Sequence, residues 1–298
     1  AGNDLLLLNR FAADSENWKA HFTNVRDTLS YLASRYKTEA TFRAIVDVAV
    51  YRILSMKMRA YDGFSWDTVR PDPERLAAFA TEHSVDDEVA VNALTRIVPL
   101  ATDATAPTFQ EGDSIVIFTQ ERYAQPFADY QPFPLLPANA LREAVLRLYG
   151  PNGTDIVSSA AVQYFTFEQL QTALTTGQEI TLTEGPPSLA TVVLNAVASA
   201  RWVVFATTGL QSSDPSSYAL KTFLAKYAHS VNGNIVVLAF GPPYELDSTE
   251  ISKLDYFYVL YSSGAAFVDA GVRALFGDLV ASGASPVDIS ALNYSIAR

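Results

Sequence analysis

The chain has 298 residues, of which 49% are hydrophobic, which is enough for one large or two ordinary globular domains and excludes a disordered chain. Its 32 acidic and 21 basic residues give a net charge of −11, which opposes binding to the phosphates of nucleic acid. The absence of cysteine excludes disulfides and thiolate sites, although the compartment stays open between cytoplasmic and exported. No apolar run approaches the roughly 20 residues of a membrane-spanning helix, so we expect a soluble chain.

The first elements predicted are a strand over Leu5 to Leu8 and then a pair of helices. Thr38 is the expected N-cap of the second helix and Gly63 its stop. This helix carries an apolar stripe at helical spacing: Phe42, Ile45, Val46, Ala49, Ile53 and Met56. Because large exposed apolar patches usually mark contacts, we expect another domain or a second copy in a homodimer to cover the stripe.

Residues 65–110 are rich in proline and predict a linker with one helix, from about Asp86 to Ile97. Beyond it, short apolar runs alternate with helical patterns. The runs are apolar on both faces, as in a parallel sheet covered by helices on both sides, so we predict a three-layer αβα sandwich of flavodoxin-like or Rossmann-like type. The predicted strands are 115–118, 161–165, 202–205, 235–240 and 256–261, and the predicted helices are 141–149, 189–200, 218–229 and 265–276.

Open α/β sheets bind ligands beyond the carboxyl ends of their strands, which directs attention to the loops after Thr119, Ala206 and Phe240. The first loop carries Glu121, Arg122 and Tyr123, followed by Phe127, Asp129, Tyr130 and Phe133. These residue types suit stacking on a sugar and hydrogen bonding to its hydroxyls, so Glu121, Arg122 and Tyr123 are our candidate substrate-binding residues. The alternative is that the aromatic residues pin the loop to its own domain.

The other loops predict structure rather than chemistry. Asp214-Pro215 predicts a helix start after the second loop, and no Walker or G-x-G-x-x-G motif indicates a nucleotide or other cofactor. In the third loop we expect the prolines to reverse the chain and Tyr244 to pack back on the fold. Asp86-Asp87-Glu88 suits the first turn of a helix better than a metal site. The three histidines (His21, His83 and His229) lie in no catalytic motif, so we assign no metal ligand and no catalytic residue.

Several segments resemble the family 3 glycoside hydrolases, and they occur in the family's order. They are Ala1-Gly2-Asn3-Asp4 with the following leucines, similar to the last barrel strand; Tyr51 to Arg59, similar to the helix that closes the barrel; Val236 to Leu246, similar to an apolar strand with a Pro-Tyr turn; Ala274 to Gly277; and Ser282 to Val287. The resemblance implies that 1–64 is the end of a (β/α)8 TIM-type barrel, 65–110 a linker and 111–298 the sandwich domain. The chain would then start inside a fold, with the rest of the barrel upstream.

Members of this family keep their nucleophilic aspartate and their KHFPGHG loop upstream of the segments that match. This chain holds no such loop, so the resemblance implies that it lacks the reaction centre and is inactive alone. Because few residues follow Pro286, the chain is more similar to the β-N-acetylhexosaminidase branch than to the β-glucosidases that add a further domain. Retaining hydrolysis of terminal β-linked sugars is the activity implied for the whole protein.

Two questions stay open at the level of sequence. Some members take their acid/base from a glutamate of the second domain, and Glu121 lies on the loop best placed for that role. The competing hypothesis is a non-catalytic module that binds glycans or a protein partner through the aromatic loop.

Overall fold

The computed structural model describes residues 3–8, 11, 18–61, 63, 65–70, 72–74, 77–78, 84–99, 107, 109–124, 131–177, 187–210, 214–286 and 288–289. The chain divides into two units, each described by itself. The first is Ala1–Thr81 with Gln125–Gln131, and the second is Glu82–Ala124 with Pro132–Arg298.

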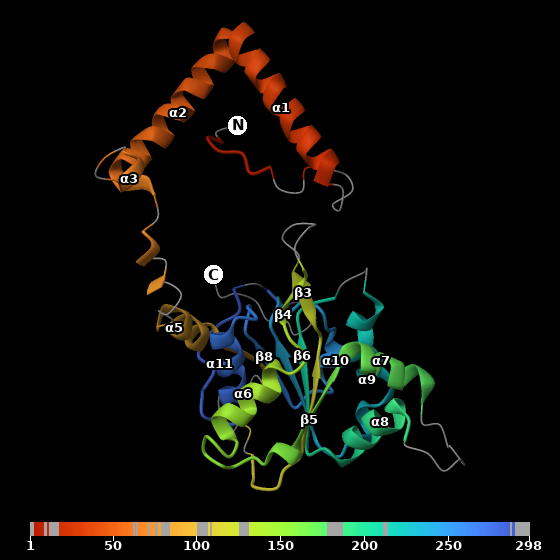
Figure 1. Cartoon of the computed structure of the whole chain (residues 1–298). Coiled ribbons are helices and arrows are strands. Elements are labelled where there is room, and N and C mark those ends of the chain that lie inside the picture. Colours follow the sequence, from red (N-terminus) through yellow and green to blue (C-terminus); the bar gives the residue numbers. More distant parts are fainter. Residues whose placement is uncertain are drawn as a thin grey trace. The chain divides into compact units, whose positions relative to one another are not determined.

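The first unit contains the predicted pair of helices, α1 (Trp18–Thr38) and α2 (Ala40–Ala60), followed by the short helix α3 (Trp66–Val69) (Figure 1). Only Glu39 separates the long helices, and its carboxylate accepts two hydrogen bonds from Arg35, of 2.8 and 2.6 Å. Thr38, the expected N-cap of α2, is instead the last residue of α1, and Glu39 occupies the cap position without a side-chain cap.

The expected strand at Leu5 to Leu8 does not form, because a barrel strand takes its hydrogen bonds from neighbouring strands and the described residues of this unit contain none. Asp4 instead accepts a hydrogen bond of 2.8 Å from Arg52 on α2, joining two of the segments that resemble the family. No side chain of α2 is buried, and Ile45 in the predicted stripe is 62% exposed. Met56 is also exposed, whereas the other four residues of the stripe are half-buried, so only part of the stripe is available for a contact outside this unit.

A six-stranded sheet forms the centre of the second unit, in the order β1-β8-β7-β6-β2-β5. All neighbours run parallel except β1, which pairs antiparallel with β8. The strands are β1 (Thr95–Val98), β2 (Ile115–Thr119), β5 (Val162–Thr166), β6 (Trp202–Thr207), β7 (Asn234–Ala239) and β8 (Tyr256–Val259). A separate hairpin of β3 (Arg122–Ala124) and β4 (Phe133–Leu136) follows β2.

Helices cover both faces of the sheet and bury a core on each side (Figure 1). Phe118 and Phe205 point into one core, while Ile117 and Val204 point into the other, as the alternation of a strand requires. The first face carries α7 (Phe167–Thr176), α8 (Leu189–Ser199), α9 (Ala219–Lys226) and α10 (Ser248–Ile251). The second carries α5 (Ser84–Ala93), α6 (Ala140–Tyr149) and α11 (Ala265–Leu275). Short 3₁₀ helices connect them: η1 (Ser159–Ala161), η2 (Pro215–Tyr218) and η3 (Ala228–Ser230).

The predicted αβα sandwich with a mostly parallel sheet is confirmed. All five predicted strands form, and helices are present at all four predicted places. The helix expected up to Ile97 ends at Ala93, and the chain then forms the edge strand β1, which sequence analysis missed. Within the described residues, no helix is long and apolar enough to cross a bilayer.

Candidate functional site

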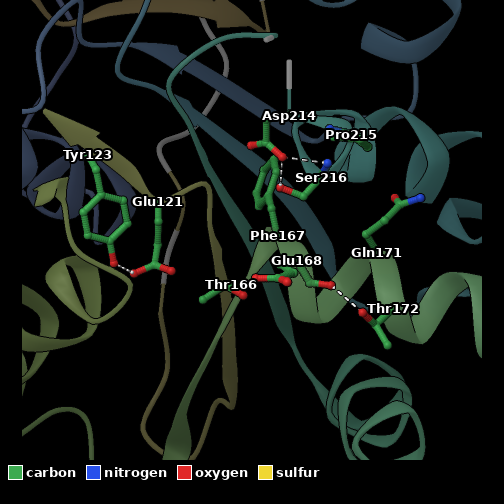
Figure 2. Close-up of a pocket in the computed structure, with 10 residues that line it drawn as sticks. All are labelled: Glu121, Tyr123, Thr166, Phe167, Glu168, Gln171, Thr172, Asp214, Pro215 and Ser216. Carbon is green, nitrogen blue, oxygen red and sulfur yellow. Dashed lines mark hydrogen bonds between the residues drawn. The ribbon is translucent and has the colours of Figure 1, made fainter. Parts of the chain in front are cut away.

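A cavity of about 490 Å³ opens at the carboxyl ends of β2, β5 and β6, where ligands sit in sheets of this kind (Figure 2). All of its lining residues belong to the second unit. They come from the chain between β2 and the middle of β3, from the end of β5 and the amino-terminal part of α7, and from the start of η2 with its cap: Glu121, Tyr123, Thr166, Phe167, Glu168, Gln171, Thr172, Asp214, Pro215 and Ser216.

Two of the three predicted substrate-binding residues lie on this cavity. Figure 2 shows the Tyr123 hydroxyl turned to Glu121, and it donates a hydrogen bond of 3.0 Å to Glu121 Oε1. That hydrogen bond raises the pKa of Tyr123, and the ring stays 55% exposed. Arg122 is exposed, but it is not among the lining residues.

The other aromatic residues expected on this loop do not line the cavity. Phe133 begins β4, pairs with Ala124 and is 49% exposed. Phe127, Asp129 and Tyr130 lie outside the described residues.

One wall of the cavity comes from α7, a helix that sequence analysis did not predict. Its start is fixed by a capping box, in which Gln169 N donates to Thr166 Oγ1 and Thr166 N donates to Gln169 Oε1. The T-F-E-Q sequence at 166–169 is the signal that would have found this helix. The Oε1 atom of Gln171, one turn further on, is buried and has no hydrogen-bond partner among the described residues.

Asp214 and Pro215 form the opposite wall and start η2 as predicted. Asp214 Oδ1 accepts hydrogen bonds from Ser216 N at 2.9 Å and from Ser216 Oγ at 2.7 Å. With Glu121 and Glu168, Asp214 gives the cavity three carboxylates and no basic residue among its lining side chains. These acceptors favour a neutral, hydroxyl-rich ligand or a cation and disfavour an anion.

Behind the cavity, a buried polar network joins the three loops that sequence analysis selected. Thr207, at the end of β6, places its hydroxyl 2.9 Å from Gln120 Oε1 and 2.8 Å from Glu245 Oε2. Gln120 and Thr207 are only 1% and 2% exposed. The order of the sheet brings these residues together, since β2, β6 and β7 are neighbours.

Burial raises the pKa of Glu245 from its ordinary value to about 7, although the hydrogen bond with Thr207 and the charge of Lys221 partly oppose the shift. Lys221 does not bond to the carboxylate. Its ammonium donates instead to the Glu245 backbone oxygen at 2.9 Å and to Glu250 Oε2 at 2.5 Å.

Tyr244 does not pack back on the fold, as we had expected, because its side chain is 62% exposed. Leu246, two residues on, provides the buried apolar anchor of this loop instead.

Metal-ligating side chains do not gather in groups of three or more within the described residues. Of the three histidines, His21 lies on α1 and His229 on η3, while His83 lies outside the described residues. None of them lines the cavity. The lining of the cavity therefore provides hydrogen-bond acceptors and an aromatic surface, but no imidazole group.

No protein-family model matches this chain, and no curated protein matches it in sequence. Solved structures do match. A fungal multi-domain GH3 β-N-acetylglucosaminidase superposes with a TM-score of 0.52 at 15% identity, covering 91% of this chain and 26% of its own. A GH3 β-N-acetylglucosaminidase from Paenibacillus sp. str. FPU-7 has a TM-score of 0.47 at 13% identity, covering 95% of this chain and 45% of its own. The β-glucoside phosphorylase BglX has a TM-score of 0.45 at 18% identity, covering 92% of this chain and 42% of its own.

The likeness to the fungal enzyme shows that the second unit has a fold found in family 3 glycoside hydrolases. The chain spans less than half the length of each of these proteins.

Proposed function

We propose that this chain is the carboxyl-terminal part of a retaining family 3 exo-glycosidase. The observation that carries the proposal is the fold likeness to a family 3 enzyme, which agrees with five segments that resemble the family in its own order. On this proposal 1–64 is the end of a TIM-type barrel, 65–110 a linker and 111–298 the sandwich domain. The upstream barrel then covers the exposed residues of the α2 stripe, Ile45 and Met56.

In the whole protein the barrel supplies the nucleophile and the acid/base, and this chain supplies architecture and part of the cleft wall. The cavity suits that role, because Glu121 and Glu168 offer acceptors for sugar hydroxyls and the exposed ring of Tyr123 offers a stacking surface. The proposed substrates are therefore terminal β-linked sugars, and among them we propose the N-acetylhexosaminides.

Hydrolysis assays test this proposal directly. The chain alone should release no 4-nitrophenol from the β-linked N-acetylglucosaminide, glucoside or xyloside, while the protein extended through its barrel should hydrolyse the first fastest. Hydrolysis by the chain alone, or none by the extended protein, would contradict the proposal. Faster hydrolysis of the glucoside would keep the family and correct the substrate.

A glycan- or protein-binding module is the second candidate, and the position of the cavity favours it, because every lining residue belongs to the second unit. Titration of the chain with N-acetylglucosamine separates the two. Sugar affinity in the chain alone, lost on Tyr123→Ala, would support the module. No affinity would support a scaffold that needs its barrel.

A further inference from the structure

The polar network behind the cavity has a fixed direction of hydrogen bonding at Gln120. Gln120 Nε2 donates to the Gly209 backbone oxygen at 2.6 Å. Its Oε1 accepts from the Thr208 and Gly209 backbone amides at 2.8 and 3.2 Å. Turning the amide over would place NH groups against NH groups. Gln120 Oε1 is therefore purely an acceptor toward the hydroxyl of Thr207.

That hydroxyl has a single hydrogen but two neighbours that need one. It lies 2.9 Å from Gln120 Oε1 and 2.8 Å from Glu245 Oε2. If Glu245 carries a proton on Oε2, Glu245 donates to Thr207, Thr207 donates to Gln120, and every contact has its hydrogen. If Glu245 is ionised, both neighbours are acceptors, so one of the two contacts becomes an oxygen–oxygen contact with no hydrogen between.

The surroundings of Glu245 favour the complete arrangement. Its Oε1 is buried without a hydrogen-bond partner among the described residues, which is costly for a charged carboxylate. The charged groups facing it are Lys221 from α9 and, beyond it, Glu250 from α10. These two pair with each other, and Lys221 reaches only the backbone oxygen of Glu245. The raised pKa of Glu245, about 7, agrees with the hydrogen count.

We propose that Glu245 is a proton-operated latch for the carboxyl-terminal edge of the sheet. With its proton, Glu245 holds Thr207 and Gln120 in one chain of hydrogen bonds and ties together the loops after β2, β6 and β7. Without it, the Thr207 hydroxyl turns to the carboxylate, and its link to Gln120 is lost. Gln120 directly precedes Glu121, so the latch also determines how firmly one wall of the cavity is held.

Amide hydrogen exchange on the full chain tests the latch, with rates corrected for the intrinsic effect of pH. The Thr208 and Gly209 amides, which bond to Gln120, should lose protection by about tenfold between pH 6 and pH 8, the effect of losing roughly one hydrogen bond. Glu245→Gln should remove this pH dependence. The matched control Glu111→Gln, an exposed carboxylate in a turn, should behave as the wild type does.

Protection that is independent of pH in the wild type, or that falls equally in Glu245→Gln, would overturn the proposal. Thr207→Val supplies a second test, because without the hydroxyl the two amides should exchange rapidly at both pH values. Should either variant fail to fold, the carboxyl carbon signal of Glu245 in the wild type decides by carbon-13 NMR. A pH titration of this signal with its midpoint near 7 supports the latch, and one with its midpoint near 4.5 overturns it.

Discussion

The hydroxyl of Tyr123 donates a 3.0 Å hydrogen bond to Glu121, so the aromatic face and the carboxylate expected to meet a sugar are held together before any ligand arrives. This pair divides the work of binding, because the ring supplies stacking area while the bond fixes the direction of the carboxylate. Two substitutions separate these contributions.

We expect Tyr123→Ala to weaken binding of N-acetylglucosamine by about fivefold, since it removes a stacking surface worth roughly 1 kcal/mol. Tyr123→Phe keeps the ring and should cost less than about threefold. Calorimetric titration of the protein extended through its barrel measures both. Tyr164→Ala, on the edge strand β5 and 43% exposed, is the control for losing an exposed tyrosine. Equal losses at the two positions would contradict a site at Tyr123.

The pH dependence of the reaction tests the role of Glu121 in the same extended protein. If Glu121 is the acid/base, Glu121→Gln should remove the alkaline limb of the kcat/KM profile, which reports the loss of the proton from the general acid. If Glu121 only binds sugar, the substitution should raise KM and leave the shape of the profile unchanged. Unchanged kinetics would exclude both roles.

The sandwich was predictable from sequence because its strands are apolar on both faces. Strands such as Trp202–Thr207, buried at every residue, could only belong to a sheet covered on both sides. β1 was not predictable in the same way, since Thr95–Val98 follows a helix after one residue and is buried only at alternate positions. Its place at the edge comes from pairing with β8, some 160 residues later.

Two of the ten residues that line the cavity, Glu121 and Tyr123, were predicted to bind a ligand, because they follow a strand that was recognised. Glu168 and Gln171 were not predicted, because the capping-box sequence that starts their helix α7 was overlooked, and surface carboxylates and amides carry no signal of their own. The network of Gln120, Thr207 and Glu245 is harder still, since its members lie 87 and 38 positions apart and meet only once the sheet has formed.

Stability should depend on pH through Glu245, and the sign follows from its raised pKa of about 7 against an ordinary value of 4.5. Between pH 4.5 and 7 the unfolded chain loses this proton while the folded chain keeps it, so the free energy of unfolding falls as pH rises. The loss is complete above pH 7 and amounts to about 3 kcal/mol.

Denaturant unfolding at pH 4 and pH 8 isolates this contribution. The contributions of the other carboxyl groups cancel when the unfolding free energy of a variant is subtracted from that of the wild type. From pH 4 to pH 8, the free energy of unfolding of Glu245→Gln should rise by up to about 3 kcal/mol relative to that of the wild type. Glu111→Gln controls for removing a carboxyl group. A constant difference between Glu245→Gln and the wild type would mean that Glu245 titrates as it does in the unfolded chain.

Gly283, in the Ser282 to Val287 segment that resembles the family, should not tolerate a side chain. Its amide donates a 2.9 Å hydrogen bond to the Leu94 carbonyl, and an added Cβ would lie 2.6 Å from the Ala93 oxygen. Because both groups are backbone, relief requires moving the start of β1, so we expect Gly283→Ala to cost about 2 kcal/mol. Gly264→Ala, whose Cβ would meet only ordinary contacts, should cost clearly less in the same denaturant titration.

Tyr149 is buried in the core on the face of the sheet that α5, α6 and α11 cover. Its hydroxyl links α6 to the chain after α11. The hydroxyl donates a 2.5 Å hydrogen bond to Asp278 Oδ2, and the ring stacks on Phe276 at 3.9 Å. Burial first, and then this bond, raises the pKa of Tyr149, so the link should persist in alkaline solution. Tyr149→Phe keeps the stack and loses the bond, which should cost about 1 to 2 kcal/mol of unfolding free energy.

Thermal or denaturant unfolding at pH 7 measures that loss, and Tyr218→Phe provides the matched control, because Tyr218 is 42% exposed at the end of η2. A loss no larger than that of Tyr218→Phe would mean that the ring environment, rather than the bond to Asp278, accounts for the stability of this link.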